Sequence, residues 1–492
     1  VTLAADISGA GALTKSGSAN LTLTGANTYT GSTTVAQGTL TVSSPVDSTV
    51  FNVNAGTLSL TATNLLPDSA TATVAGGATL NVAAAERIQQ LTLAGAITGA
   101  GTLTANTYAL DGATVSANLG TGTLTSSGAS TLNNTVGATS VTVTAGTLTL
   151  PVAERLANTA TVTVQAGATL SLTGAAADET VANLHLAGTL AGAGTLIATD
   201  TTQLTGANVN AALDTDALEQ LGGSSTLRAA VNVNTSTLVS AGTLTVGDGA
   251  AAGSLGTGTL SLSTGATLEF ARDSLVTWDT NITGTGGTLR AAGSGGFVLD
   301  AVASAVDAVE VPAATFTLAN GNSNRLNNSA AVSVTNSATF ALGNRDETVG
   351  SLNLTGTLGG DPTSKLTASS GATLNATSVV NALLGGSSLT VLGNATLNND
   401  ASAGTVNVNA GTLTLGASGG LGSTANVTVA TGAGLTLSST QSVGAFTLAG
   451  TLSGGSNRLN VSGAATLQDG ALVDAQIGSG TLDSSGAVAI HQ

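Results

Sequence analysis

Residues 9–42 read GAGALTKSGSANLTLTGANTYTGSTTVAQGTLTV, and this stretch decides the fold. Apolar and hydroxyl side chains alternate for a few positions, as in Leu21-Thr22-Leu23, until a glycine such as Gly25 interrupts them and the alternation starts again. A period of two is typical of short strands with one buried face, and the glycines are typical of tight turns between such strands. The rest of the chain repeats this alternation more loosely, which predicts a repetitive all-β fold.

A longer repeat is superimposed on these strands. Its units open at a leucine near residues 66, 156, 255, 326 and 421. After each opening comes an acidic or amide residue followed by a strand, and these segments align without gaps at residues 86–91, 179–184, 273–278, 347–352 and 441–446. Within a unit the strands return about every 20 residues, which is typical of one coil of a β-helix. The sequence therefore predicts one continuous, single-domain parallel β-helix (β-solenoid) of roughly two dozen coils over residues 1–492.

Three segments fit this pattern poorly. Residues 290–312 fit it worst, and we predict an irregular coil or loop there. The best helical signals lie at residues 85–90 and 214–221, and each predicts at most one helical turn at a corner of the β-helix.

Composition restricts the class of protein. A hydrophobic content of 42% excludes a disordered chain, and with 2% aromatic residues the core must consist of Leu, Val and Ala. Polar residues or glycine interrupt every apolar run well short of the roughly 18 residues of a membrane-spanning helix. The absence of cysteine excludes disulfides and thiolate metal sites.

The net charge and the start of the sequence lead to two further predictions. A net charge of −16, with ten scattered Lys and Arg residues, argues against nucleic-acid binding, which needs clustered cations. The chain contains no Met and begins at Val1 without a basic and apolar leader, so we expect a processed or excised piece of a longer protein.

The opening stretch resembles the autotransporter-associated β-strand repeat of secreted passenger domains in Gram-negative bacteria, and the chain is similar to large surface adhesins of the β-helix type. The matching positions are Gly9, Gly11, Leu13, Lys15, Gly17, Leu21, Leu23, Gly25, Asn27, Tyr29, Gly31, Thr33, Val35, Gly38 and Leu40. Ala19 and Ser32 stand where the family commonly has glycine. The resemblance implies a right-handed β-helix that is exported by an outer-membrane transporter outside this chain. It specifies no activity, because such passengers include adhesins, proteases and esterases.

Two histidines are available for a Ser-His-Asp triad. His185 alternates with leucines that are predicted to point inward, so its own side chain is predicted to point outward. His491 is the last residue but one. The Gly-x-Ser-x-Gly match at residues 416–420 lacks the strand-to-helix turn that a nucleophilic serine needs. We therefore predict no triad.

Paired carboxylates act on glycosidic bonds in many enzymes, and parallel β-helices include polysaccharide lyases and hydrolases. The candidates are Asp178 with Glu179, Asp346 with Glu347, and Asp214, Asp216 and Glu219. The first two pairs align with Gln441, which cannot transfer a proton. Solvation of the turn or a hydrogen bond to the backbone explains that position better, and we predict no catalytic residue.

No metal or cofactor site is predicted either. The glycine-rich nonapeptides of calcium-binding β-rolls are absent, and Gly-Asp-Gly at residues 247–249 is too short a signal by itself. Trp278 takes an inward position in the aligned repeat and is predicted to belong to the core. Tyr29 and Tyr108 are predicted to lie in turns where they could be exposed, but two rings do not make a binding face.

The expected function is structural: the extracellular rod of a bacterial surface adhesin or fibre, secreted or on the cell surface, and not an enzyme. It would mediate attachment to neighbouring cells, aggregation, or matrix and biofilm formation. Uncapped terminal strands could pair end to end into filaments, and outward Thr and Asn side chains could bind host or matrix glycans. The alternative is a polysaccharide-acting lyase or hydrolase, which predicts acids and basic residues clustered along one face.

Overall fold

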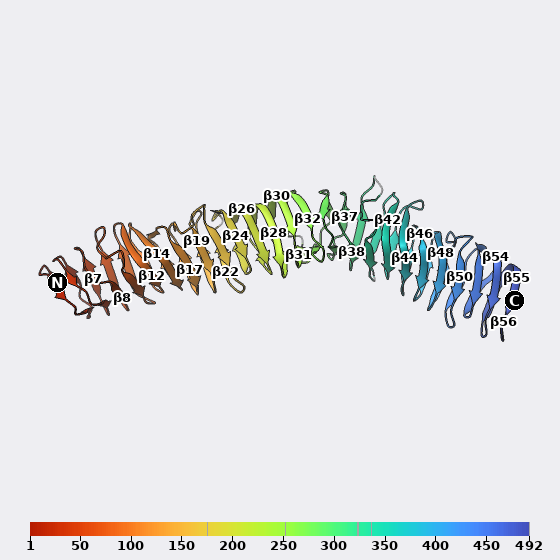
Figure 1. The fold of residues 1–492 in the computed structure, drawn as a ribbon, viewed down its shortest axis with the longest axis horizontal. Helices are drawn as coiled ribbons and strands as arrows, with labels where there is room; N and C mark the ends of the chain where they lie inside the picture. Colours follow the sequence, from red (N-terminus) through yellow and green to blue (C-terminus); the bar gives the residue numbers. More distant parts are fainter. Residues whose placement is uncertain (175, 251, 322–323, 336, 492) are drawn as a thin grey trace. The chain divides into compact units, whose positions relative to one another are not determined.

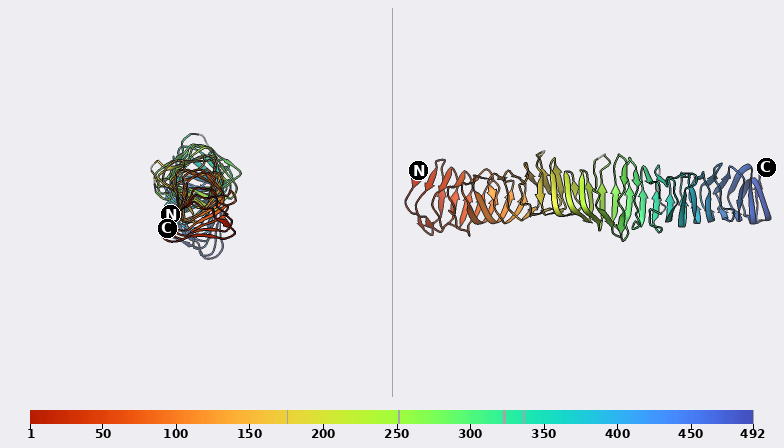
Figure 2. Two further views of the ribbon diagram at one scale, coloured as in Figure 1. Left: turned by 90° about the vertical axis from the view of Figure 1, so that its left-hand side faces the viewer. Right: turned by 90° about the horizontal axis from the view of Figure 1, so that it is seen from above.

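The computed structural model describes residues 1–174, 176–250, 252–321, 324–335 and 337–491. The described chain is all-β, without a helix, and its parallel strands stack as a β-solenoid of about 25 turns (Figure 1). The predicted fold class is therefore confirmed. Within each unit described below, a strand hydrogen-bonds to the strand one coil earlier and to the strand one coil later (Figure 2).

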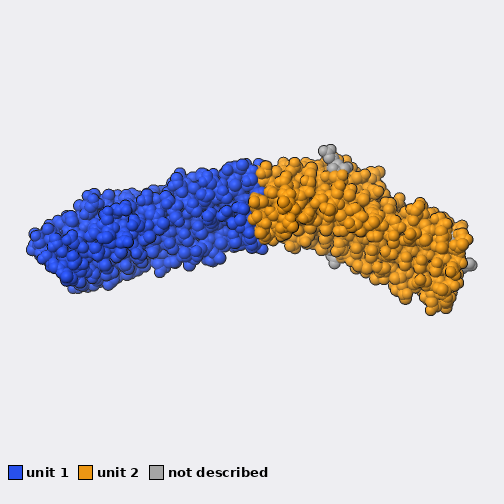
Figure 3. Space-filling model, viewed as in Figure 1, with its two compact units in different colours: residues 1–237, 253–257 blue, residues 238–252, 258–492 orange. Residues whose placement is uncertain are grey.

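The described residues divide into two compact units (Figure 3). Unit 1 contains residues 1–237 and 253–257, and unit 2 contains residues 238–252 and 258–492.

Unit 1 contains two long columns in which each strand pairs in parallel with the next. The first column is β1 (Thr2–Leu3), β4 (Leu21–Leu23), β7 (Thr39–Val42), β9 (Thr57–Leu60), β11 (Thr79–Val82), β13 (Ala96–Thr98), β15 (Thr114–Val115), β18 (Ala129–Leu132), β20 (Thr147–Leu150), β22 (Thr169–Leu172), β25 (Thr189–Gly192), β27 (Asn208–Val209) and β29 (Ser224–Leu227). The second is β3 (Leu13–Lys15), β6 (Thr33–Val35), β8 (Val50–Val53), β10 (Thr71–Val74), β12 (Glu86–Leu93), β14 (Thr102–Asp111), β17 (Thr123–Ser127), β19 (Ser140–Val143), β21 (Thr161–Val164), β24 (Asn183–Leu186), β26 (Thr195–Thr205) and β28 (Ala212–Gly222).

Unit 2 is built in the same way. One column is β31 (Thr243–Val246), β33 (Thr267–Phe270), β36 (Thr288–Ala291), β38 (Ala308–Val311), β40 (Ala331–Val334), β42 (Glu347–Leu354), β44 (Lys365–Leu374), β46 (Leu383–Val391), β48 (Ala401–Val408), β50 (Asn426–Val429) and β53 (Ala445–Leu448). The other is β34 (Val276–Trp278), β37 (Phe297–Leu299), β39 (Thr315–Leu318), β41 (Thr339–Ala341), β43 (Thr357–Gly359), β45 (Ser378–Val380), β47 (Ala395–Leu397), β49 (Thr412–Leu415) and β51 (Gly434–Leu437). Both columns lead into β54 (Thr451–Leu467), which pairs with β55 (Leu472–Ser484).

Inward and outward side chains alternate as the sequence predicts. Leu40, Leu58 and Leu80 lie in register on β7, β9 and β11, and all three are fully buried. Their neighbours Thr39 and Thr57 are half-exposed. Successive side chains of a strand point to opposite faces, so each coil contributes its leucines to one continuous core. Burying each such side chain stabilises the fold by about 1.5–3 kcal/mol.

A row of aromatic rings fills part of the core of unit 2. Phe270, Phe297, Phe316 and Phe340 follow one another with ring centroids 4.8, 5.1 and 5.6 Å apart. Trp278 is buried and packs against Phe270 at 5.5 Å, as its predicted core position requires.

Two sequence predictions are wrong. Residues 290–312 are not an irregular coil, because they contain β37 and β38, both in parallel register with their neighbours. Glycines and small residues around these short strands obscure their alternation in the sequence. Residues 85–90 and 214–221, the predicted helical turns, lie almost wholly in strands β12 and β28.

Candidate functional site

The most distinctive polar feature is a buried glutamate that recurs at the aligned turn of the longer repeat. In three copies both carboxylate oxygens accept hydrogen bonds from successive backbone N–H groups at the repeat opening one coil earlier. The donors are Leu65 and Leu66 at 2.8 and 3.2 Å for Glu86, Arg155 and Leu156 at 2.7 and 2.7 Å for Glu179, and Arg325 and Leu326 at 2.9 and 3.1 Å for Glu347. We call this arrangement the carboxylate clamp.

The backbone before each pair of donors explains why the two N–H groups converge. The preceding residue has a positive φ in all three copies: 50° at Asn64, 54° at Glu154 and 57° at Asn324. A left-handed residue in a turn directs successive N–H groups to one side, where they form a concave anion site known as a nest. Asn tolerates this conformation better than Glu does, so Glu154 is the strained member of the set.

The other two copies depart from the clamp in different ways. Gln441 keeps the buried position: its Oε1 accepts the Leu421 N–H at 3.3 Å, and its Nε2 donates to the Gly419 carbonyl at 3.1 Å. Asp273, one methylene shorter than glutamate, is exposed instead. In four of the five copies the position therefore holds a side chain that bridges two coils, either an acid or a neutral amide.

Burial dominates the electrostatics of the clamp. Desolvation raises the pKa of Glu179 to about 7, although the N–H groups of Arg155 and Leu156 lower it, and the neighbouring Glu154 raises it further. Burial likewise raises the pKa values of Glu86 and Glu347 above the usual range for a carboxyl group. A general acid in catalysis also needs a pKa near 7, so the raised pKa alone does not distinguish a catalytic glutamate from a structural one. The contacts of the carboxylate oxygens have to make that distinction.

In the two predicted acid pairs, each carboxylate accepts a hydrogen bond from the backbone of a neighbouring coil. In each pair the second acid is the clamp glutamate. The first acid binds another backbone N–H: Asp178 accepts from Thr195 at 2.8 Å, and Asp346 accepts from Lys365 at 2.9 Å. The two acids of a pair thus serve different coils.

The third group of acids lies along β28. Asp214 accepts the Asn234 amide at 2.8 Å, Asp216 accepts the Thr235 hydroxyl, and Glu219 accepts the Gln203 amide at 3.1 Å. Among the described residues, no group of three His, Cys, Asp or Glu side chains has a geometry that could hold a metal ion.

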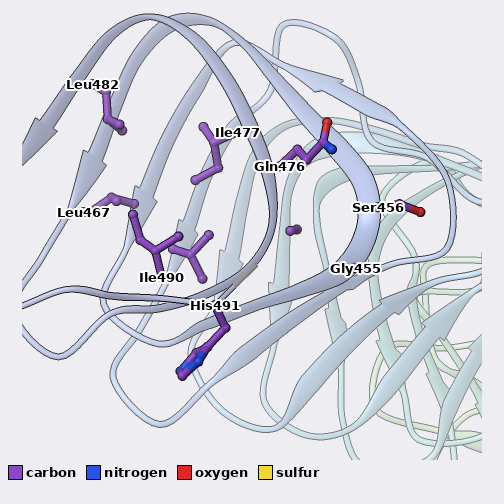
Figure 4. A pocket seen from close by; sticks show the side chains of 10 residues that line it. Gly455, Ser456, Leu467, Gln476, Ile477, Leu482, Ile490 and His491 are labelled. Atoms are coloured by element: carbon purple, nitrogen blue, oxygen red, sulfur yellow. The ribbon is translucent and has the colours of Figure 1, made fainter.

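His185 lies six residues after Glu179, and His491 lies near the other end of the described chain. His185 is exposed on β24, as predicted, with Thr163 and Gln203 at the paired positions on either side. His491 lines a hollow of about 630 Å³ at β54 and β55, together with apolar side chains that include Leu467, Ile477 and Ile490 (Figure 4). Among the described residues, no Asp or Glu side chain lines this hollow.

The prediction for the tyrosines is wrong. Tyr29 and Tyr108 are buried in β5 (Thr28–Tyr29) and in β14. Their hydroxyl groups have partners inside: Tyr29 shares a hydrogen bond of 2.7 Å with Thr33, and Tyr108 donates to the Leu103 carbonyl at 3.0 Å. These bonds make burial of the whole side chain possible.

Lys15, one of the positions that match the repeat family, has a structural role that the sequence did not indicate. Its side chain is buried, and its ammonium group donates to the carbonyl oxygens of Ser16, Gly17 and Gln37 at 2.9, 2.6 and 3.0 Å. Gln37 lies one coil later, so Lys15 joins two turns as the glutamates do. A lysine at the end of an alternating strand gives no sequence signal for this role, because an exposed lysine would look the same.

Among the described residues there is no apolar helix of the length needed to cross a membrane.

Parts of the chain are similar to known proteins. Residues 13–42, which contain Lys15, Tyr29 and Thr33, match the family described as passenger-associated-transport-repeat. A segment of 54 residues, 11% of this chain, is 54% identical to an extracellular serine protease of Serratia marcescens and spans only 5% of that protein. No solved structure matches the chain. The repeat at residues 13–42, the local similarity and the β-solenoid fold together support an autotransporter passenger repeat domain.

Proposed function

We propose that this passenger domain is a structural part of a bacterial surface adhesin or fibre, secreted or held at the cell surface, that mediates attachment, aggregation or matrix formation. One observation carries the proposal: the buried acids and Lys15 are bound to backbone groups of neighbouring coils. Side chains committed in this way join neighbouring coils, which favours a structural role over a catalytic one. Contacts with other molecules are left to the outward side chains. An outer-membrane transporter outside this chain would export it.

The outward side chains of unit 1 form uncharged columns that suit neutral glycans. Thr39, Thr57 and Thr79 lie in register on three successive coils. Beside them, Asn81 donates to the Ser59 hydroxyl at 3.0 Å. Hydroxyl and amide groups donate and accept hydrogen bonds without the desolvation cost of a charge, which matches the hydroxyl groups of a sugar.

Unit 2 offers two hollows of the same chemistry. One, of about 400 Å³, is lined by residues that include Asn353, Thr373, Thr390 and the exposed Leu392. A second, of about 350 Å³, is lined by Thr377, Ser378, Val379, Asn394, Ala395, Thr396, Thr412 and Thr414. Neither lining includes a charged residue. Uncharged donors and acceptors around an exposed leucine favour a neutral polysaccharide over a charged one.

The test is binding of the whole chain to an array of neutral and charged glycans. We expect binding to neutral glycans, and we expect Thr390→Glu to weaken it by placing a charge in the larger hollow. Thr317→Glu is the matched control, because Thr317 is also a half-exposed strand threonine of unit 2 but lies outside both hollows. Absence of binding to any neutral glycan would sink the attachment proposal. Release of new sugar ends would favour the polysaccharide-acting enzyme instead.

End-to-end self-association is a second mode, favoured by the apolar hollow in Figure 4. Leu482 and Ile490, which line it, are 57% and 60% exposed. Exposed apolar groups beside a strand edge invite the addition of another strand, here from a second copy of the chain. Electron microscopy over a concentration series tests this mode. Filaments that disappear in Leu482→Lys support it, and single particles at every concentration contradict it.

A further inference from the structure

Glu179 is the clamp glutamate with the least compensation for its burial. Its side chain is 0% exposed, and the N–H groups of Arg155 and Leu156 are its hydrogen-bond partners. Glu179 begins β23 (Glu179–Val181), which pairs with β26, and the residue opposite it there is the apolar Leu196. The charged groups that act on the carboxylate are Glu154 and Arg155.

Neither the arginine nor the nearby aspartate neutralises this carboxylate. The Arg155 guanidinium donates to the carbonyl oxygens of Ala153 and Asn133 at 2.9 and 3.1 Å. Asp178 is turned to the backbone of the next coil, as described above. Among the described residues, Glu179 has no ion pair, so its negative charge is held by two backbone N–H groups alone.

The fifth copy of the repeat shows that a neutral side chain fits the same place. Gln441 accepts the Leu421 N–H through its oxygen and donates to the Gly419 carbonyl through its nitrogen. A protonated glutamic acid also carries one acceptor oxygen and one donor group, and it has the same length. Gln441 thus shows that this position of the repeat can hold a neutral side chain of the same length.

We propose that Glu179 is a proton-dependent latch: as the neutral acid it closes the coil that runs from Arg155 to Glu179, and its ionisation weakens that closure. The coil would then be firmest in acidic surroundings and already looser at neutral pH.

The direction follows from the two protonation equilibria. The pKa of Glu179 is about 7 in the folded chain against an ordinary value of 4.5, because burial disfavours the charged form. Between these pH values the folded coil keeps a proton that the unfolded coil has lost, so folding takes up a proton there. The contribution to stability is fully present below pH 4.5 and is lost as the pH rises through 7. This difference corresponds to a change of roughly 300-fold in the folding equilibrium of the coil.

The experiment is native-state hydrogen exchange of the whole chain between about pH 5 and pH 8, corrected for the intrinsic effect of pH, with amides of β23 (Glu179–Val181) and β26 as reporters. We expect the opening equilibrium of these amides to rise roughly 50- to 100-fold over this range in the wild type. Glu179→Gln, which copies the fifth repeat, is expected to remain closed at pH 8 and to lose the pH dependence.

Glu219→Gln is the matched control, because it removes a half-exposed acid from the same unit and should leave the pH dependence of β23 unchanged. Gln441→Glu is the reciprocal variant, and it should introduce the same pH dependence at β52 (Gln441–Val443). An unchanged pH response in Glu179→Gln would overturn the proposal. If that variant does not fold, a pH-independent Gln441→Glu would overturn it equally.

Discussion

The row of phenylalanines in unit 2 allows the cost of one truncation to be worked out. Phe316→Ala removes a fully buried ring that lies 5.1 Å from Phe297 and 5.6 Å from Phe340. Truncating a buried Phe to Ala lowers the free energy of unfolding by about 3–5 kcal/mol. Each ring pair contributes about 0.5–1.5 kcal/mol beyond burial. Phe446→Ala is the matched control in the same unit, because Phe446 is 1% exposed and stacks on none of the described rings.

We therefore expect Phe316→Ala to cost about 1–3 kcal/mol more than Phe446→Ala. Trp278 is the only tryptophan, and it lies 5.5 Å from Phe270 in the same row, so its fluorescence reports on this part of the core during urea denaturation. Stability along a solenoid is a sum of local terms, so the fluorescence transition should move further in Phe316→Ala than in the control. Equal shifts of the transition would refute the contribution of ring contacts. Phe316→Leu keeps most of the volume but loses both ring contacts, so it should still cost about 1–3 kcal/mol.

Three further substitutions test the polar contacts and the turns. Lys15→Met leaves three carbonyl groups without the ammonium and should cost about 3 kcal/mol, measured as faster hydrogen exchange in β3 and β6; unchanged protection would contradict this. Glu154→Asn should stabilise the second repeat by about 1 kcal/mol, because asparagine suits the φ of 54°, and a lower unfolding midpoint would count against the strain argument. Gly56→Ala should cost about 2 kcal/mol or more, because the new Cβ would meet the Gly38 carbonyl oxygen at a φ of +79°; a neutral result would show that this turn can shift.

The fold could be predicted from the sequence because alternation fixes which side chains face inward. Leu40 and Thr39 are assigned correctly to the two faces, and so are Trp278 and His185. The strands at residues 297–299 and 308–311 were missed because the glycines and alanines around them obscure the alternation of apolar and polar residues.

The buried polar groups could not be placed in the same way. Tyr29 stands among Asn, Thr and Gly, a composition typical of turns, and its burial depends on Thr33, whose position only the coil determines. Glu179 looks like a turn acid, since charged residues are rarely buried. The one signal available was alignment with Gln441, because an acid and an amide share a length and an acceptor oxygen but not a charge.

These inward polar groups also bear on how the coils find their neighbours. Leucine stacks on leucine almost anywhere along the solenoid, so apolar burial alone hardly distinguishes the correct neighbouring coil from one displaced by a turn. The carboxylate clamp does distinguish them, because Glu86 meets a left-handed Asn64 and two convergent N–H groups only on the correct coil. A displaced coil would leave the acid and both N–H groups buried without partners, at about 1–3 kcal/mol for each group. A buried acid that costs stability at neutral pH can thus still favour one register over its alternatives.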